Sequence, residues 1–267
     1  MTAINPKKTG ISYQESLSKE LLDESKKNAT PKEYSIVNGE THTKEKKKLG
    51  IITIGQSPRL DITRDLIPML SDDFSIIEKG ALDDFTYEQV MQNFAPSDED
   101  LVLVSRMRDG RQAKFAEKYI IDLVQKAIED VEEQGCEVVA LMCTGEFPEL
   151  KTKSILLRPQ EIVYDLLKCI AKDKKLGIVA PDESQIDQTY ETWRGVAKEL
   201  SIVSASPYLD NVAFEESVDN LLQENVDLIY LNCMGYSAAM KKAVENLTGK
   251  SIILPRTLIA RIIKELA

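Results

Sequence analysis

From residue 49 onward, the chain alternates short apolar runs with segments whose apolar positions recur every three or four residues. Runs that are apolar along their whole length are typical of strands buried on both faces, and the longer spacing is typical of amphipathic helices. In the first half the pattern predicts strands at 49–54, 74–77, 101–104 and 137–142, and helices at about 59–70, 87–94 and 114–133.

The second half continues the alternation after a short ambiguous segment at 155–157. It predicts strands at 176–180, 202–205, 227–232 and 252–254, and helices at about 159–171, 183–200, 214–224, 237–247 and 258–266. Strands that alternate with helices indicate an α/β fold of parallel sheets covered on both faces and joined by right-handed crossovers.

Two pairs of segments resemble each other across the halves. Residues 49–52 read LGII and residues 176–179 read LGIV. Residues 137–145 read EVVALMCTG and residues 227–235 read DLIYLNCMG, so in both an acidic residue opens an apolar strand that ends in Cys-x-Gly. We interpret this as a duplication that produces two lobes, each with a small parallel sheet, facing one another. The first lobe is expected to comprise residues 47–172 with about 250–267, and the second residues 173–249.

Residues 1–46 differ from the rest because they are rich in Lys, Glu, Ser, Asn and Thr. Such a composition predicts a polar extension that is mobile or loosely docked. Leu17, Leu21 and Leu22 share one face of a helix that could form over 14–28, so a helix packing on a partner subunit is the alternative.

The net charge, the single histidine and the cysteine pattern exclude several classes of partner and of catalytic site. The formal net charge is -10, which argues against a nucleic-acid backbone or an anionic membrane as the main partner. His42 is the single histidine, so a Ser-His-Asp or Cys-His hydrolase, a multi-histidine zinc site and a histidine general base are disfavoured. The four cysteines form no CxxC pair, and the apolar runs are too short for a membrane span. We expect a cytoplasmic protein with reduced thiols and no metal.

Cys143 and Cys233 are the strongest catalytic candidates, because each follows a predicted strand and ligands bind beyond the carboxyl ends of parallel strands. Two thiols facing one cleft suit a two-base proton transfer at a carbon next to a carboxylate. A strand-to-helix turn would favour the thiolate through backbone N–H groups and a helix N-terminus. The alternative interpretation is that both are core residues, as free cysteines often are. Cys136 and Cys169 are expected to be structural.

Candidate ligand-binding residues cluster beside these strand ends. The turn Gln56-Ser57 and the following Arg59 offer donors to an anion, although Ser57 could instead cap a helix. Arg106 and Arg108 belong to an arginine-rich turn whose alternative role is a solvated loop. The residues that flank the two cysteines complete the set: Thr144, Gly145, Asn232, Met234 and Gly235. Arg158 and Arg256, each beside a proline, are weaker candidates, and Tyr190 and Trp193 are expected to be packing residues.

Several of these motifs resemble the AroM family. They are IGQSPR at 54–59, EKGALD at 78–83, SRMRDG at 105–110, LMCTGEF at 141–147, ASPY at 205–208 and NCMGYS at 232–237. The similarity covers about residues 49–267. It implies a distant relation to the aspartate/glutamate/hydantoin racemase superfamily, with two flavodoxin-like lobes, a site between them and no cofactor. By this resemblance Cys143 and Cys233 match the superfamily's cysteine pair, Ser57 matches a substrate-binding serine, and Thr144 holds a carboxylate.

The motifs also depart from those of glutamate racemases, which carry Cys-Asn-Thr and Cys-Thr-His where this chain has Cys-Thr-Gly and Cys-Met-Gly. The leading hypothesis is a cofactor-independent racemase, epimerase or isomerase that acts on a small carboxylate. A non-catalytic sensor or binding protein for a small anion and a single-thiol decarboxylase are the alternatives. The expected partner is a small-molecule carboxylate rather than nucleic acid or membrane, and a homodimer is also compatible with the sequence.

Overall fold

The computed structural model describes residues 45–209 and 211–267, and residues 45–267 form one compact unit. The predictions for the N-terminal extension up to residue 44, including the helix at 14–28, lie outside the described residues.

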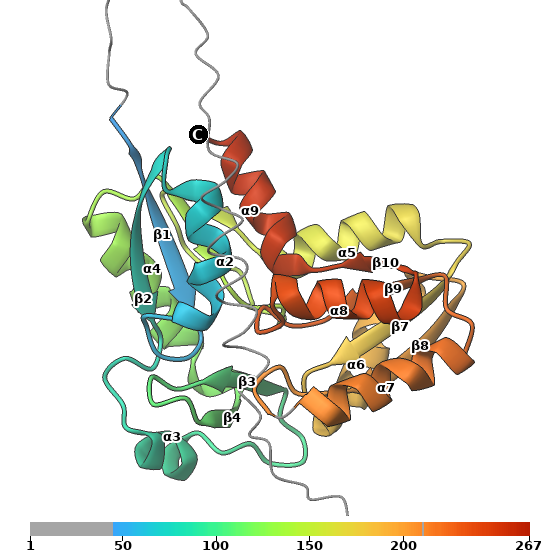
Figure 1. The fold of residues 1–267 in the computed structure, drawn as a ribbon. Coiled ribbons are helices and arrows are strands. Elements are labelled where there is room, and N and C mark those ends of the chain that lie inside the picture. Colours follow the sequence, from blue (N-terminus) through green and yellow to red (C-terminus); the bar gives the residue numbers. More distant parts are fainter. Residues whose placement is uncertain (1–44, 210) are drawn as a thin grey trace, which may run out of the picture. The chain divides into compact units, whose positions relative to one another are not determined.

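The first lobe is built on a parallel sheet in the order β2-β1-β5-β6 (Figure 1). Its strands are β1 (Lys47–Thr53), β2 (Phe74–Gly80), β5 (Val138–Leu141) and β6 (Ile155–Leu157). Successive side chains of a strand point to opposite faces, so Leu49 and Ile51 pack under α2 (Leu60–Leu70), whereas Ile52 packs against α4 (Ile121–Glu133).

The second lobe has a parallel sheet in the order β10-β9-β7-β8. Its strands are β7 (Lys175–Ala180), β8 (Glu199–Ser204), β9 (Leu228–Leu231) and β10 (Ser251–Ile253). One face packs against α7 (Asn211–Gln223) and α8 (Ala238–Thr248), and the other against α5 (Pro159–Ile170) and α6 (Ile186–Trp193).

The two sheets correspond strand for strand, because β8-β7-β9-β10 repeats the order β2-β1-β5-β6. The registers agree as well: Gly50 lies opposite Val139, and Gly177 opposite Ile229. A Cβ on Gly50 would lie 2.7 Å from a methyl of Val131 in α4, and one on Gly177 would lie 3.2 Å from a methyl of Leu221 in α7. The glycine repeated in the two opening strands therefore lets the crossover helix approach each sheet closely.

The lobes exchange their last helices, which refines the predicted boundaries. Helix α9 (Pro255–Glu265) contributes Ile259 and Ile263 to the core of the first sheet, whereas β10, just before it, pairs with β9 in the second sheet. Conversely, α5 was assigned to the first lobe, and its Val163 and Leu167 lie in the core of the second sheet. The helix that ends each lobe, α5 for the first and α9 for the second, thus packs against the sheet of the other lobe.

The largest departure from the predicted elements is an antiparallel hairpin of β3 (Val102–Arg106) and β4 (Gln112–Ala116), which forms its own two-stranded sheet. The prediction of a parallel strand at 101–104 and of a helix beginning at 114 was wrong here. The chain continues through η1 (Glu117–Tyr119) before α4 begins. In the second lobe the predicted helix at 183–200 divides into η2 (Glu183–Gln185), α6 and the start of β8. The short α3 (Tyr87–Asn93) is close to its predicted range.

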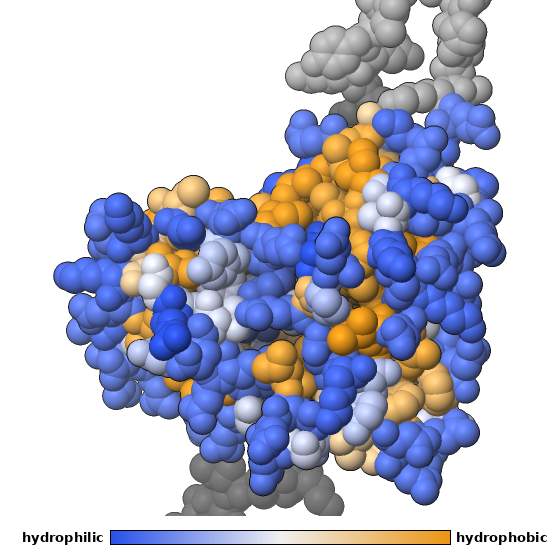
Figure 2. Space-filling model, turned by 180° about the vertical axis from the view of Figure 1, so that it is seen from behind, coloured by the Kyte–Doolittle hydropathy of each residue, from blue (hydrophilic) through white to orange (hydrophobic). Residues whose placement is uncertain are grey.

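Polar side chains cover most of the face seen in Figure 2, with apolar patches among them. Within the described part of the chain, no helix combines the length and the hydropathy needed to cross a bilayer.

Candidate functional site

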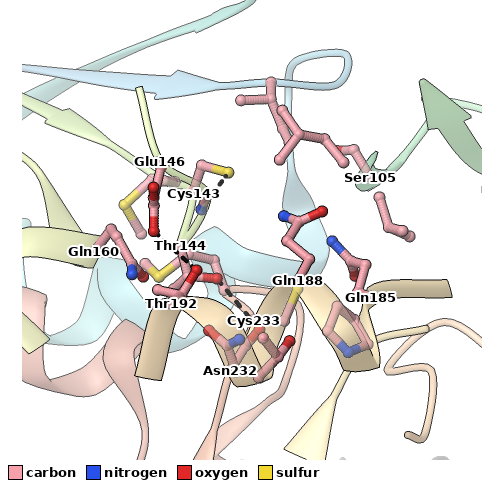
Figure 3. Close-up of a pocket in the computed structure, with 18 of the residues that line it drawn as sticks. Ser105, Cys143, Thr144, Glu146, Gln160, Gln185, Gln188, Thr192, Asn232 and Cys233 are labelled. Carbon is pink, nitrogen blue, oxygen red and sulfur yellow. Dashed lines mark hydrogen bonds between the residues drawn. The ribbon is translucent and has the colours of Figure 1, made fainter. Parts of the chain in front are cut away.

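The carboxyl ends of β5 and β9 bring Cys143 and Cys233 to the same cavity. Cys143 is 8% exposed and Cys233 7% exposed, so both thiols are nearly enclosed. Figure 3 shows Cys143 and Thr144 coming from the first lobe, and Asn232 and Cys233 from the second. The cavity has a volume of about 50 Å³. One water needs roughly 10–15 Å³ of such space, so the cavity has room for a few water molecules or a small ligand.

The repeated Cys-x-Gly has a direct structural role. The Gly145 N–H donates a hydrogen bond to Cys143 Sγ at 3.2 Å, and the Gly235 N–H donates one to Cys233 Sγ at 3.3 Å. A Cβ on Gly145 would lie 2.6 Å from a methyl of Leu103, and one on Gly235 would lie 2.5 Å from the hydroxyl of Tyr208. Glycine therefore places an N–H beside each sulfur and lets side chains from other segments pack on the turn.

These donors do not produce a ready thiolate. Burial raises the pKa of Cys143 to about 12, against the opposing effect of the Gly145 and Thr144 N–H groups. Burial also raises the pKa of Cys233, although the Gly235 N–H and the Tyr208 hydroxyl oppose it. The expected helix N-terminus is absent at Cys143, since β6 is the next element, and α8 begins at Ala238, five residues after Cys233. The free protein therefore holds both thiols protonated near neutral pH.

A pH series of alkylation tests this protonation. At pH 7.5, a pKa of about 12 leaves the thiolate fraction of Cys143 about a thousandfold below that of an ordinary thiol. Iodoacetamide should therefore modify exposed Cys169 first, and the buried pair should react only as the pH rises above 9. Unfolded cysteines ionise near pH ~8.5, so the folded protein should also lose stability between that pH and the folded pKa. Mass spectrometry of tryptic peptides measures the modification, and fast labelling of Cys143 at pH 7.5 would contradict the result.

Arg59 lines the cavity, but its guanidinium is fully engaged. Nε and Nη2 donate to the two carboxylate oxygens of Asp61 at 2.8 and 2.7 Å, and Nη1 donates to the hydroxyls of Ser105 and Thr53. The remaining Nη2 bond reaches the Tyr208 hydroxyl at 3.3 Å. These contacts use all five donors of an arginine. Burial by itself would lower the pKa of Arg59, but Tyr208 and Asp61 reverse this and raise it. Arg59 therefore has no donor left for another partner, and it bears on the cavity through its positive charge and through its bond to Tyr208.

Five of the other predicted ligand-binding residues lie outside the cavity lining: Gln56, Ser57, Arg106, Arg108 and Gly235. The Gln56 carboxamide donates to the carbonyls of Leu82 and Phe85 and accepts from the Arg108 N–H. The Ser57 hydroxyl donates to Asp83 at 2.7 Å.

The two loop arginines are engaged locally as well. Arg108 donates to Asp83 and to the Ser57 carbonyl, and Arg106 Nε donates to the Gly110 carbonyl. This group joins the turn after β1 to the β3–β4 turn. Its members therefore support the first-lobe loops rather than face the two thiols.

The turns beside the cysteines are held across the lobes. Thr144 Oγ1 donates to the Asn232 carbonyl at 3.3 Å, and Thr144, Gly145, Asn232 and Met234 all line the cavity. Buried Arg256 donates to the carbonyls of Met234 and Gly235, to the Asp61 carbonyl and to the Asp65 carboxylate. Arg256 is thus a clamp that joins the Cys233 turn to α2.

Neither of the weaker arginine candidates lines the cavity. Arg158 donates to the Phe147 carbonyl and pairs with Glu161. Trp193 packs between Tyr164 and Tyr230, as expected, whereas Tyr190 is exposed.

Sequence reasoning missed a set of polar residues that line the cavity. Those that carry hydrogen-bonding side chains are Ser105, Glu146, Gln160, Gln185, Gln188, Thr189, Thr192 and Tyr208. In Figure 3, Gln185 and Gln188 extend from the η2–α6 segment toward the first lobe. Within the described residues, Gln160 Oε1, Gln185 Oε1 and Asn232 Oδ1 are buried without a hydrogen-bond partner. A buried acceptor without a donor is costly, so these oxygens are available to accept hydrogen bonds from N–H or O–H groups of a molecule in the cavity.

The β3–β4 hairpin closes one side of the cavity by bonding to the second lobe. Val102 accepts a bond from Gln185 Nε2 through its carbonyl and donates its N–H to Gln188 Oε1. Lys114 pairs with Asp182 at 2.7 Å. Among the described residues, no three His, Cys, Asp or Glu side chains gather in a way that could hold a metal ion.

Solved structures with this two-lobed arrangement include two racemases and an isomerase. The aspartate racemase of Picrophilus torridus has a TM-score of 0.52 at 12% identity and covers 82% of this chain and 93% of that chain. The allantoin racemase of Klebsiella pneumoniae has a TM-score of 0.55 at 12% identity, over 82% and 87% of the two chains. The maleate cis-trans isomerase of Nocardia farcinica has a TM-score of 0.55 at 11% identity, over 82% and 91%. These likenesses confirm the racemase-type fold predicted from the sequence.

No curated protein matches the sequence significantly. The family model described as AroM protein matches residues 49–267. That range contains both lobes, the hairpin and both Cys-x-Gly turns, and it starts where the predicted alternation of strands and helices begins. The chain belongs to the AroM protein family.

Proposed function

We propose that this protein is a cofactor-independent enzyme that moves a proton at a carbon next to the carboxylate of a small acid, as a racemase, epimerase or isomerase does. The observation that carries the proposal is that two thiols from matching strand ends line one cavity. A carbon between two such groups can lose a proton to one sulfur and gain a proton from the other. The racemases and the isomerase that share the fold support this reaction class.

The residues that line the cavity limit the chemical groups that a ligand can carry. Arg59 has no donor left for a direct bond. The carboxylate is assigned to the Thr144 hydroxyl, which would exchange its 3.3 Å bond to the Asn232 carbonyl for a bond to the ligand. The unpartnered oxygens of Gln160, Gln185 and Asn232 call for donors. The substrate proposed is therefore a small carboxylic acid that also bears an amino, amide or hydroxyl group near the reacting carbon.

Deuterium exchange tests the proposal. The full chain is incubated in deuterated water with a panel of small 2-amino, 2-amido and 2-hydroxy acids, and with unsaturated diacids. We expect solvent deuterium to appear at the carbon next to the carboxylate of at least one acid, measured by proton NMR and mass spectrometry. A chain that binds an acid, as shown by a rise in melting temperature, but catalyses no exchange would contradict the enzymatic proposal.

A binding or sensor function is the second candidate, and the burial of the thiols favours it. Both pKa values are raised, and a non-catalytic cavity needs no thiolate. The two functions differ in what binding does to the thiols. In an enzyme, the thiolate takes part in proton exchange, so replacing a thiol slows the exchange. In a sensor, the thiols can be replaced without loss of ligand affinity. Ligand affinity of Cys143→Ser and Cys233→Ser, measured by calorimetry beside the exchange rate, separates the two.

A further inference from the structure

The surroundings of the two sulfurs are not equivalent, although the strands that carry them are. Each sulfur accepts a hydrogen bond from the glycine N–H two residues later. Cys233 Sγ also lies 3.8 Å from the hydroxyl of Tyr208, which is within hydrogen-bond distance for sulfur. Within the described residues, no side-chain hydroxyl bonds to Cys143 in this way.

The direction of the Tyr208 bonds follows from the chemistry of arginine. A guanidinium has donors and no acceptor, so in the 3.3 Å contact Arg59 donates and the Tyr208 oxygen accepts. The single proton of the Tyr208 hydroxyl is then free to donate to Cys233 Sγ, and once Cys233 is a thiolate the sulfur can only accept in this contact. The guanidinium of Arg59 also lies over the Tyr208 ring, 5.6 Å from its centroid. A continuous chain of donors therefore runs from a buried cation to one of the two sulfurs.

Nearby residues keep this chain in place. Tyr208 can reach the turn because residue 235 is a glycine. A Cβ at that position would lie only 2.5 Å from the Tyr208 oxygen. Asp61 holds Arg59 through two bonds, and Ser105 holds it through a third. The tyrosine and the guanidinium are thus held by groups other than a ligand.

We propose that Tyr208, polarised by Arg59, makes Cys233 the thiol that ionises first and hence the base, and leaves Cys143 as the acid. This inference rests on the proposed function for its catalytic meaning. In the forward step the C–H bond of the ligand breaks, its proton passes to the Cys233 thiolate, and its electron pair is delocalised into the adjacent carboxylate. The Cys143 S–H bond then breaks as its proton joins the opposite face of the carbon, which leaves a thiolate at Cys143. Tyr208 is a positioning residue in this scheme.

The charges around each sulfur agree with this order. The pKa of Cys233 is raised by burial but is opposed by Gly235, Tyr208, Arg59 and Arg256. The pKa of Cys143 is raised to about 12 by burial and by the nearby Cys233, against the opposing Gly145 and Thr144 N–H groups and Arg59. Tyr208 and Arg256 thus oppose the effect of burial at Cys233 alone. The other titratable groups that interact with these sulfurs are tyrosines, which are neutral below pH ~10: Tyr230 and Tyr236.

Site-resolved alkylation tests the order without a substrate. Iodoacetamide labelling of the full chain is followed by mass spectrometry from pH 7 to 12.5, and circular dichroism shows over which part of that range the chain stays folded. The pH midpoint of each cysteine is compared, because the midpoint reports ionisation, whereas the maximal rate also depends on how accessible the sulfur is. We expect Cys233 to have a midpoint at least one pH unit below that of Cys143. We expect Y208F to raise the Cys233 midpoint by about one unit, a tenfold loss of thiolate, and to leave the Cys143 midpoint unchanged.

Y236F is the matched control. Tyr236 is buried beside the same turn, and its hydroxyl donates to the Ala205 carbonyl at 2.6 Å, with no bond to the sulfur. It should leave the Cys233 midpoint in place. Equal shifts in Y208F and Y236F, a shift of both cysteines in Y208F, or a lower midpoint for Cys143 in the wild type would overturn the proposal. Should Y208F fail to fold, the wild-type comparison of the two midpoints decides alone.

The two proposals can fail separately. A low Cys233 midpoint that depends on Tyr208, in a chain that exchanges no carbon-bound proton, supports the assignment of Tyr208 and contradicts the enzymatic function. Exchange in the wild type with a Cys233 midpoint that Y208F does not move supports the function and contradicts the role of Tyr208.

Discussion

Replacing either Cys143 or Cys233 with serine is expected to slow proton exchange at the substrate carbon by about 10²–10⁴-fold, the usual contribution of a positioned acid or base. Serine keeps the shape of the side chain, but its hydroxyl does not ionise near neutral pH, so each variant retains the cavity and loses one proton carrier. The exchange rate in deuterated water measures the loss. C169S is the control, because Cys169 is exposed on α5 and does not line the cavity.

The pattern of the two losses distinguishes the reaction classes. A large loss in both variants fits two-base proton transfer. A loss in one variant alone fits chemistry through a single thiol, as in the decarboxylase alternative. Exchange at the wild-type rate in both variants contradicts any role of the thiols.

Arg256→Ala is expected to lower the free energy of unfolding by about 3–5 kcal/mol, the range for breaking a buried, hydrogen-bonded ion pair. The side chain of Arg256 is 0% exposed, and its bonds to Asp65 and to the carbonyls of Met234 and Gly235 would be lost together. Those acceptors would remain largely away from water, which is the main source of the cost. Urea unfolding followed by circular dichroism measures the change.

The control for Arg256 lies on the same helix. Arg261 is exposed on α9, so R261A should change the free energy of unfolding by less than about 0.5 kcal/mol. A loss below about 1 kcal/mol in R256A would contradict the view of Arg256 as a clamp between the Cys233 turn and α2.

The parallel strands and the duplication could be predicted from the sequence because the physics behind them is local. A strand buried on both faces must be apolar throughout, as residues 138–141 and 228–231 are. The Gly50 and Gly177 pair marks the close approach of a crossover helix at equivalent positions. The Cys-x-Gly repeat could be found in the same way, because the bond from the glycine N–H to the sulfur spans only two residues.

The β3–β4 hairpin was not predicted because the local helix preference of its second strand is misleading. Residues 114–121 contain good helix formers and neither glycine nor proline, which is why a long helix is predicted to begin at 114. Ala113 and Phe115 are nevertheless buried as alternate residues of a strand. The available signal was Asp109-Gly110, a common hairpin pair, and Gly110 adopts a φ of 93° in the turn.

The cavity residues were harder to predict because they come from segments distant in sequence. Gln160, Gln185 and Tyr208 reach the site through the packing of two lobes and the exchange of their last helices. Arg59 was predicted to bind an anion, but its guanidinium donates two hydrogen bonds to the Asp61 carboxylate instead. That pairing depends on the first turn of α2, which carries Asp61. Ser57 is a predicted ligand-binding residue both from its turn and by resemblance, whereas in the structure its hydroxyl donates to Asp83.

A bifunctional reagent tests most directly whether the two sulfurs share one ligand-sized space. The full chain is treated at pH 9.5 with 1,3-dibromoacetone, in which each thiolate displaces one bromide and a three-carbon bridge forms. Tryptic mapping is expected to find Cys143 and Cys233 joined by one bridge within the same chain, and C143S or C233S should abolish it. Separate adducts on the two cysteines, or a bridge from either one to Cys136 or Cys169, would contradict the shared site.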